Sequence, residues 1–154
     1  MTVNEGHRDW EELVEIIWGA LDYFQEGIWE EVKFLGNVSL EHDMEVSSNE
    51  GVHGAFNLGN LMNKLRMLKT SMRAEELLLA LTQDPVILVY HRFVTDGFRR
   101  IINLVQDYVA ENVGLVSLFK IDKETSIKVT AHGLGHNQGL THHLDPVGLM
   151  YIVY

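Results

Sequence analysis

The chain has 154 residues, of which 46% are hydrophobic, and its formal net charge is −10. This length and apolar content predict one globular domain over residues 1–154, large enough to bury a core. The acidic balance argues against a nucleic-acid partner and against an anionic membrane surface. The absence of cysteine excludes disulfides and cysteine-bound zinc. Because no secretion signal and no run of eighteen apolar residues is visible, we expect a cytoplasmic location.

Helical and extended patterns alternate along the chain, which favours mixed α/β layer packing, an α+β fold. Apolar side chains recur at helical spacing in five predicted helices: residues 9–25, 61–68, 75–82, 98–111 and 123–138. For 98–111 the β-branched content leaves a strand as the alternative. Runs rich in β-branched and apolar residues predict three strands: residues 31–40, broken at Gly36-Asn37, then 86–90 and 113–121. Asp9 and Asp122 are the expected N-caps, and residues 95–97 the expected turn.

The acidic segment 41–60 is predicted to be a loop. It holds four side chains of metal-binding type, which are His42, Asp43, Glu45 and His53. Since they follow no fixed periodicity, we interpret them as part of a solvated loop and not as a metal site.

The C-terminal part of the chain, HGLGHNQGLTHHLDPVGLMY at 132–151, carries the strongest chemical signal. His132 and His136 are four residues apart, so on a helix both imidazoles lie on one face and can reach one ion. Gly139 can end that helix in a left-handed conformation. His142 can then supply a third nitrogen from another direction. Three histidines with one open position are the ligand set expected of a catalytic zinc.

The spacing HxxxHxxGxxH, followed by Met150, resembles the metzincin pattern HExxHxxGxxH with its Met-turn. It looks most like that of the archaemetzincins. The resemblance implies a mixed twisted sheet packed with helices, including a C-terminal active-site helix that binds Zn, and Met150 as an apolar floor under the ligands. It also implies that strand 113–121 is an edge strand along which a peptide or protein segment could bind.

Position 133, where active metzincins carry their general-base Glu, is Gly133. General acid–base assistance is typically worth about 10²–10⁴-fold in rate, so the sequence predicts a zinc-binding protein related to metallopeptidases with impaired catalysis. His143 and Asp145 are the candidates for a surrogate base or for partners of the zinc ligands. Two alternatives stay open: an active zinc-dependent peptidase that uses such a surrogate, and a metal-free interaction protein.

Overall fold

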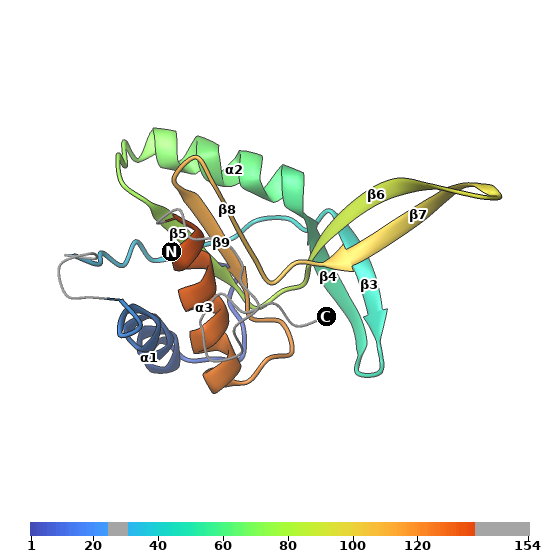
Figure 1. Cartoon of the computed structure of the whole chain (residues 1–154). Helices are drawn as coiled ribbons and strands as arrows, with labels where there is room; N and C mark the ends of the chain where they lie inside the picture. Colours follow the sequence, from blue (N-terminus) through green and yellow to red (C-terminus); the bar gives the residue numbers. More distant parts are fainter. Residues whose placement is uncertain (25–30, 138–154) are drawn as a thin grey trace.

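A computed structural model describes residues 1–24 and 31–137, and this part of the chain forms an α+β fold (Figure 1). Its three helices are α1 (Trp10–Leu21), α2 (Leu58–Ser71) and α3 (Lys123–Asn137). The strands of the larger sheet are β1 (Thr2–Val3), β2 (Asn37–Val38), β5 (Leu78–Thr82), β8 (Asp107–Ala110) and β9 (Val113–Ser117). Those of the smaller sheet are β3 (Met44–Ser48), β4 (Gly51–Asn57), β6 (Val86–Val94) and β7 (Gly97–Leu104).

The larger sheet has the strand order β2-β1-β5-β9-β8. Strands β2, β1, β5 and β9 are mutually parallel, whereas β8 runs antiparallel to β9 at the edge of the sheet. Every residue of β9 is buried. Its sequence, Val-Gly-Leu-Val-Ser, accordingly lacks the polar alternation of a strand with one solvated face.

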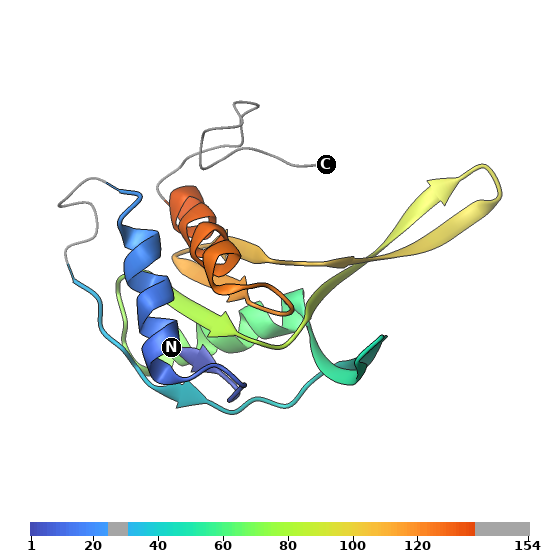
Figure 2. The same ribbon diagram turned by 90° about the horizontal axis from the view of Figure 1, so that it is seen from below.

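Helices cover both faces of the larger sheet (Figures 1 and 2). On one face α2 packs Leu61, Met62 and Leu65 against Leu115 of β9. On the other face α1 packs Ile16 and Ile17 against Leu81 of β5 and Val116 of β9. Helix α3 lies beside α1 on this second face, and small side chains at their contact, Ala20 and Ala131, let the two helices approach closely. The strands are thus the middle of three layers.

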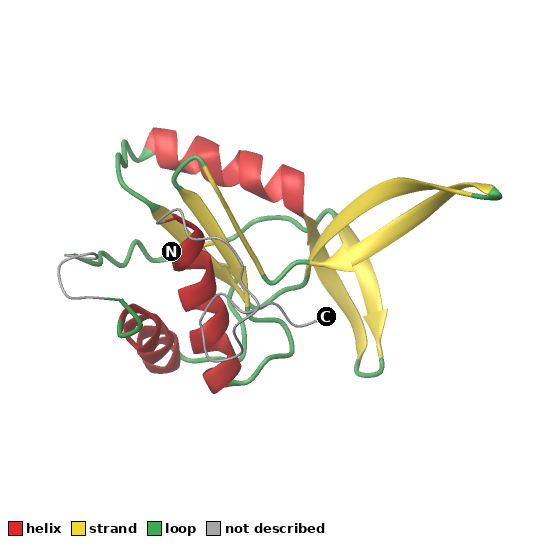
Figure 3. Ribbon diagram, in the orientation of Figure 1, coloured by secondary structure: helices red, strands yellow, loops and turns green. Residues whose placement is uncertain are grey.

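The smaller sheet extends away from this layered body (Figure 3). Strands β6 and β7 form a long antiparallel hairpin, and only the first two residues of β6 pair with β4. No helix in the described part of the chain is both long and apolar enough to cross a membrane.

Two of the predicted helices are confirmed with their caps. Helix α1 begins after Asp9, whose side chain accepts a hydrogen bond from the backbone N–H of Glu12. Helix α3 begins after Asp122, whose carboxylate accepts a 2.7 Å bond from the N–H of Thr125. The expected helix at 61–68 lies within α2, the predicted strand 86–90 lies within β6, and a two-residue turn joins β6 to β7.

Three predicted elements are wrong, and in each the pairing of strands, local in hairpins or long-range, overrides the local pattern. The segment 41–60 contains β3, β4 and the start of α2 instead of a loop. Residues 75–82 are leucine-rich, but 78–82 form β5 because they pair with β1 and β9. Residues 98–111 form β7 and β8, not a helix, which agrees with the β-branched alternative.

The predicted strand 113–121 is shorter than expected and is not an edge strand. Residues 113–117 form β9, which pairs with β5 on one side and with β8 on the other. Both rows of its backbone hydrogen-bonding groups are therefore occupied, so a peptide cannot be added to β9. The edge of the sheet next to α3 is β8.

We predict that Asp122→Ala lowers the melting temperature at neutral pH, because it removes the N-cap of α3. The hydrogen bond from the Thr125 backbone, followed by that from its side chain, lowers the pKa of Asp122 below the usual 3.8. A lowered pKa in the folded state means that this stabilisation is present above the pKa of the unfolded chain and is lost as the pH falls through the folded value. Thermal unfolding of both proteins between about pH 7 and 2 should therefore show a difference in melting temperature that disappears at acidic pH. A difference in melting temperature that stays the same at every pH would contradict a stabilising role of the Asp122 carboxylate.

Candidate metal centre

Helix α3 brings two of the predicted ligands together. His132 and His136 lie one turn apart, with ring centroids separated by 4.5 Å and ring planes at 87°. Both residues are partly buried. This confirms that the two imidazoles share one face of a helix, as their spacing predicts.

A carboxylate from the sheet meets these histidines. Asp107 is the first residue of β8, and its Oδ2 lies 3.0 Å from Nδ1 of His132. The side chains of Asp107 and His132 are 15% and 19% exposed, so the pair is largely shielded from solvent. The antiparallel pairing with β9 fixes Asp107 opposite Val116, on a strand against which α3 packs.

One ligand atom from each of Asp107, His132 and His136 lies within 4.8 Å of the other two, so this group could hold a metal ion. Two imidazoles and a carboxylate are a donor set that suits zinc and other divalent transition metals. Partial burial suits such a site as well, because the charge of the ion offsets the cost of keeping a carboxylate away from bulk water. In the described residues this is the one such group.

Gly133 faces the same carboxylate. A Cβ atom at position 133 would lie 3.5 Å from Cβ of Asp107 and 3.8 Å from its Oδ2. The direction in which a Glu side chain would leave α3 therefore points toward Asp107. The chain lacks a carboxylate on residue 133, but β8 supplies one close to that position.

The remaining predicted site residues, His142, His143, Asp145 and Met150, lie outside the described residues, as does Gly139. Asp107 is not predicted from the sequence, because a helix over 98–111 places no constraint on its distance from His132. The only local signal is that Asp107 is the single charged residue in the stretch 101–110.

Three of the four side chains of metal-binding type in segment 41–60 have hydrogen-bonding partners in the structure. His42 Nε2 lies 2.8 Å from Oδ2 of Asp84. Asp43 accepts hydrogen bonds from the backbone of Asn57 and the side chain of Asn60 at the start of α2. His53 Nε2 lies 2.9 Å from the Ser48 hydroxyl.

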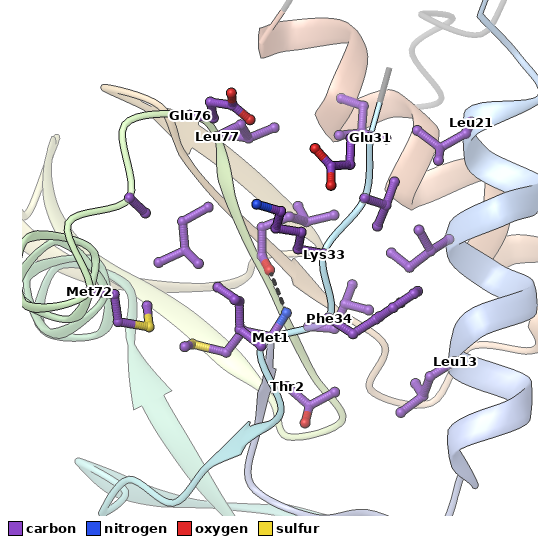
Figure 4. Close-up of a pocket in the computed structure, with 18 of the residues that line it drawn as sticks. Met1, Thr2, Leu13, Leu21, Glu31, Lys33, Phe34, Met72, Glu76 and Leu77 are labelled. Atoms are coloured by element: carbon purple, nitrogen blue, oxygen red, sulfur yellow. Dashed lines mark hydrogen bonds between the residues drawn. The ribbon is translucent and has the colours of Figure 1, made fainter. Parts of the chain in front are cut away.

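A cavity of about 530 Å³ is lined by residues of α1, of β5 and of segments 31–35 and 72–77, and by Leu134 of α3 (Figure 4). It is lined mainly by apolar side chains, such as Leu13 and Leu21 of α1 and Leu134 of α3. The α-amino group of Met1 also lies here and donates to the carbonyl of Leu79, and burial lowers its pKa. Since Leu134 is two residues from both histidines, it projects from another face of the helix. The cavity and the candidate metal centre are therefore separate features.

No protein-family model, no curated protein and no solved structure matches this chain.

We predict that Gly133→Ala raises the free energy of unfolding by up to about 1 kcal/mol, since alanine is the better helix former. The added methyl group would make only ordinary contacts, the nearest at 3.5 Å. Gly19→Ala in α1 is the matched comparison, because its Cβ would lie 2.9 Å from the side chain of Ile127. The free energy of unfolding, measured with urea, should therefore be higher for Gly133→Ala than for Gly19→Ala. The opposite order would mean that position 133 is more crowded than its contacts indicate.

Proposed function

We propose that this protein is a metzincin-like zinc-binding protein, related to metallopeptidases but impaired in peptide hydrolysis. The observation that carries the proposal is the convergence of Asp107, His132 and His136 within 4.8 Å. The zinc identity rests on the donor set and on the resemblance of HxxxHxxGxxH to metzincins, in which His142 would be a further ligand.

Asp107 has a defined role in this proposal. Its Oδ2 lies 3.0 Å from Nδ1 of His132. With the Nδ1–H donating to this carboxylate, the tautomer and orientation of the ring would be fixed, and Nε2 would be left to bind the metal. Such carboxylate partners of metal-bound histidines also raise the basicity of the ligand nitrogen. Asp107 is therefore a positioning residue for His132. Direct coordination by Asp107 is the alternative arrangement of the same three side chains.

The impairment follows from Gly133. When bound, zinc acidifies water and polarises a carbonyl group. Peptide hydrolysis also needs a group that accepts the proton of the water and delivers it to the leaving amine. Glycine has no such group, and the carboxylate of Asp107 is engaged with His132.

A second candidate, an active zinc peptidase, is favoured by one observation. Oδ2 of Asp107 is 3.8 Å from the position that a Cβ on residue 133 would occupy, so a carboxylate already lies close to where a glutamate side chain there would begin. If Asp107 turned from His132 to water, it would be the general base. This gives the surrogate-base alternative a specific residue in the described part of the chain.

We predict that the purified chain binds one zinc ion, and that replacing both His132 and His136 by Ala abolishes stoichiometric binding. Asp107→Asn keeps the shape of the side chain but weakens acceptance from His132. Loss of such a partner typically reduces metal affinity about 10–100-fold. Competition with a chromophoric chelator measures the affinity, and elemental analysis measures the zinc content. Saturating zinc should also raise the melting temperature of the parent chain, since a ligand that binds only the folded state stabilises it.

His91→Ala is the control for these substitutions, because His91 is exposed on the β6–β7 hairpin. It should leave zinc binding unchanged. Stoichiometric, tight zinc binding by the chain that lacks both His132 and His136 would disprove the proposed centre. A loss much greater than about 100-fold in Asp107→Asn would identify Asp107 as a direct ligand.

We predict that the chain cleaves peptides poorly and that Gly133→Glu raises the zinc-dependent rate by up to about 10²–10⁴-fold, the usual size of general-base assistance. Gly133→Gln is the matched control, because it has the same length but cannot accept the proton. The measurement compares cleavage of a peptide library at equal zinc content. The new carboxylate would face Asp107, so the two negative charges could repel each other. Making Gly133→Glu together with Asp107→Asn tests whether this repulsion lowers the rate.

The same assay separates the two candidate functions. Efficient zinc-dependent cleavage by the parent chain that is lost in Asp107→Asn, at equal zinc content, would identify an active peptidase whose base is Asp107. Equal rates for Gly133→Glu and Gly133→Gln would show that a carboxylate at this position supplies no catalysis.

A further inference from the structure

The β6–β7 hairpin, residues 86–104, forms an arm that extends from the body of the protein (Figures 1 and 2). From the rise per residue of a strand, the nine residues of β6 span about 30 Å. Beyond Ile87 nearly every residue of the arm is exposed, and this includes large apolar side chains: Leu88, Tyr90, Phe93, Val94, Phe98, Ile102 and Leu104. A two-stranded hairpin with both faces in water is only marginally stable, and an apolar surface of this extent indicates a binding site.

The arm differs in charge from the rest of the molecule. It carries three arginines and one aspartate, a net charge of +2. Because the whole chain has a net charge of −10, the residues outside the arm carry −12. Arg92 and Arg99 stand directly opposite each other in the hairpin. Like charges at this position are unfavourable in an isolated sheet. An anionic partner would remove that repulsion.

The tip of the arm adds aromatic surface to this charge. Phe93 and Phe98 are paired across the hairpin with ring centroids 4.0 Å apart, and they are 75% and 68% exposed. The arm therefore presents arginines next to exposed aromatic rings. The complementary surface is one that carries carboxylates around an aromatic side chain, since arginine binds both.

Helix α1 has such a surface. Glu11, Glu15, Trp18 and Asp22 recur at helical spacing along one face, and Trp18 at its centre is 51% exposed. Glu15 already pairs with Lys123 of α3, so Glu11 and Asp22 are the carboxylates on either side of Trp18 that are left for a partner. Helix α1 contains three glutamates and no basic residue, whereas α2 contains basic residues and no acidic one. Helix α3 mixes both signs at its exposed start. Of the three described helices, α1 alone matches the arm in charge and in aromatic content.

The arm points away from the body on the side opposite to α1 (Figures 1 and 2). It therefore cannot reach α1 of its own chain. We propose that the arm of one copy binds the exposed face of α1 of a second copy. Because the two surfaces differ and lie at opposite ends of the molecule, the contact is heterologous. It generates a ring if the rotation between copies closes and an open series of oligomers if it does not.

The test uses the full chain in analytical ultracentrifugation over a range of concentrations, with and without zinc. The expected result is a mass that rises past the dimer, and it does not depend on the metal. Two double variants should each weaken association about tenfold or more, since each exposed ion pair contributes up to about a factor of five. The arm variant combines Arg92→Gln with Arg99→Gln, and the α1 variant combines Glu11→Gln with Asp22→Asn. Lys64→Gln with Lys69→Gln on α2 removes the same charge as the arm pair and should have no effect.

Mixing the two weakened proteins gives the sharpest result. The protein with the two arginine substitutions retains an intact α1 face, and the protein with the two substitutions on α1 retains an intact arm. Together they should therefore form a one-to-one dimer and nothing larger. A chain that is monomeric at every concentration would overturn the proposal, as would an equal effect of the α2 control. Sedimentation of a monomeric chain with phosphatidylserine vesicles would assign the arm to a membrane instead, and would also overturn it.

Discussion

The antiparallel pairing of β8 with β9 is the constraint on which the candidate metal centre depends. Strand β9 is fixed on both faces, by α2 on one side and by α1 and α3 on the other. Because β8 returns along β9, Asp107 is held opposite Val116 and beside α3. Only in this arrangement does a carboxylate meet two histidines, the nearer of which is 25 residues away in the chain. Within residues 1–24 and 31–137, β8 is an edge strand, so one row of its backbone groups makes no strand pairing there.

Helix α3 is a poor helix by composition, since Gly133 and Gly135 each cost about 1 kcal/mol relative to alanine. Tertiary contacts hold it in place. The nearly buried Arg8 donates to Ser126 of α3 and to the carbonyl of Ile121 just before it. Small side chains at the contact with α1 allow close packing. The helix that carries the histidines is thus anchored at its start, where cap and arginine act together, and along the face that it turns to α1.

The molecule separates its charges in space. The acidic body contains the candidate metal centre, and the basic, aromatic arm extends about 30 Å from it, several times the Debye length at physiological salt. Salt therefore largely screens the charges at the tip of the arm from the acidic body of the same chain. Strand β7 leads through two residues into β8, so the arm is also continuous in sequence with the strand that carries Asp107.

The sequence by itself determined the elements whose signals are local. The caps Asp9 and Asp122, the helical face of α1, and the pairing of His132 with His136 on α3 all follow from spacings of three or four residues. Strand β5 and the interior position of β9 were decided only by tertiary structure, because β5 pairs with β1 and β9, which are distant in sequence. For β7 and β8 the β-branched content of 98–111 left a strand open, and pairing in hairpins with β6 and β9 decided it. The role of Asp107 belongs to this second group. Its chemistry is visible in the sequence, but its distance from His132 is set by the register of β8 against β9 and by the packing of α3.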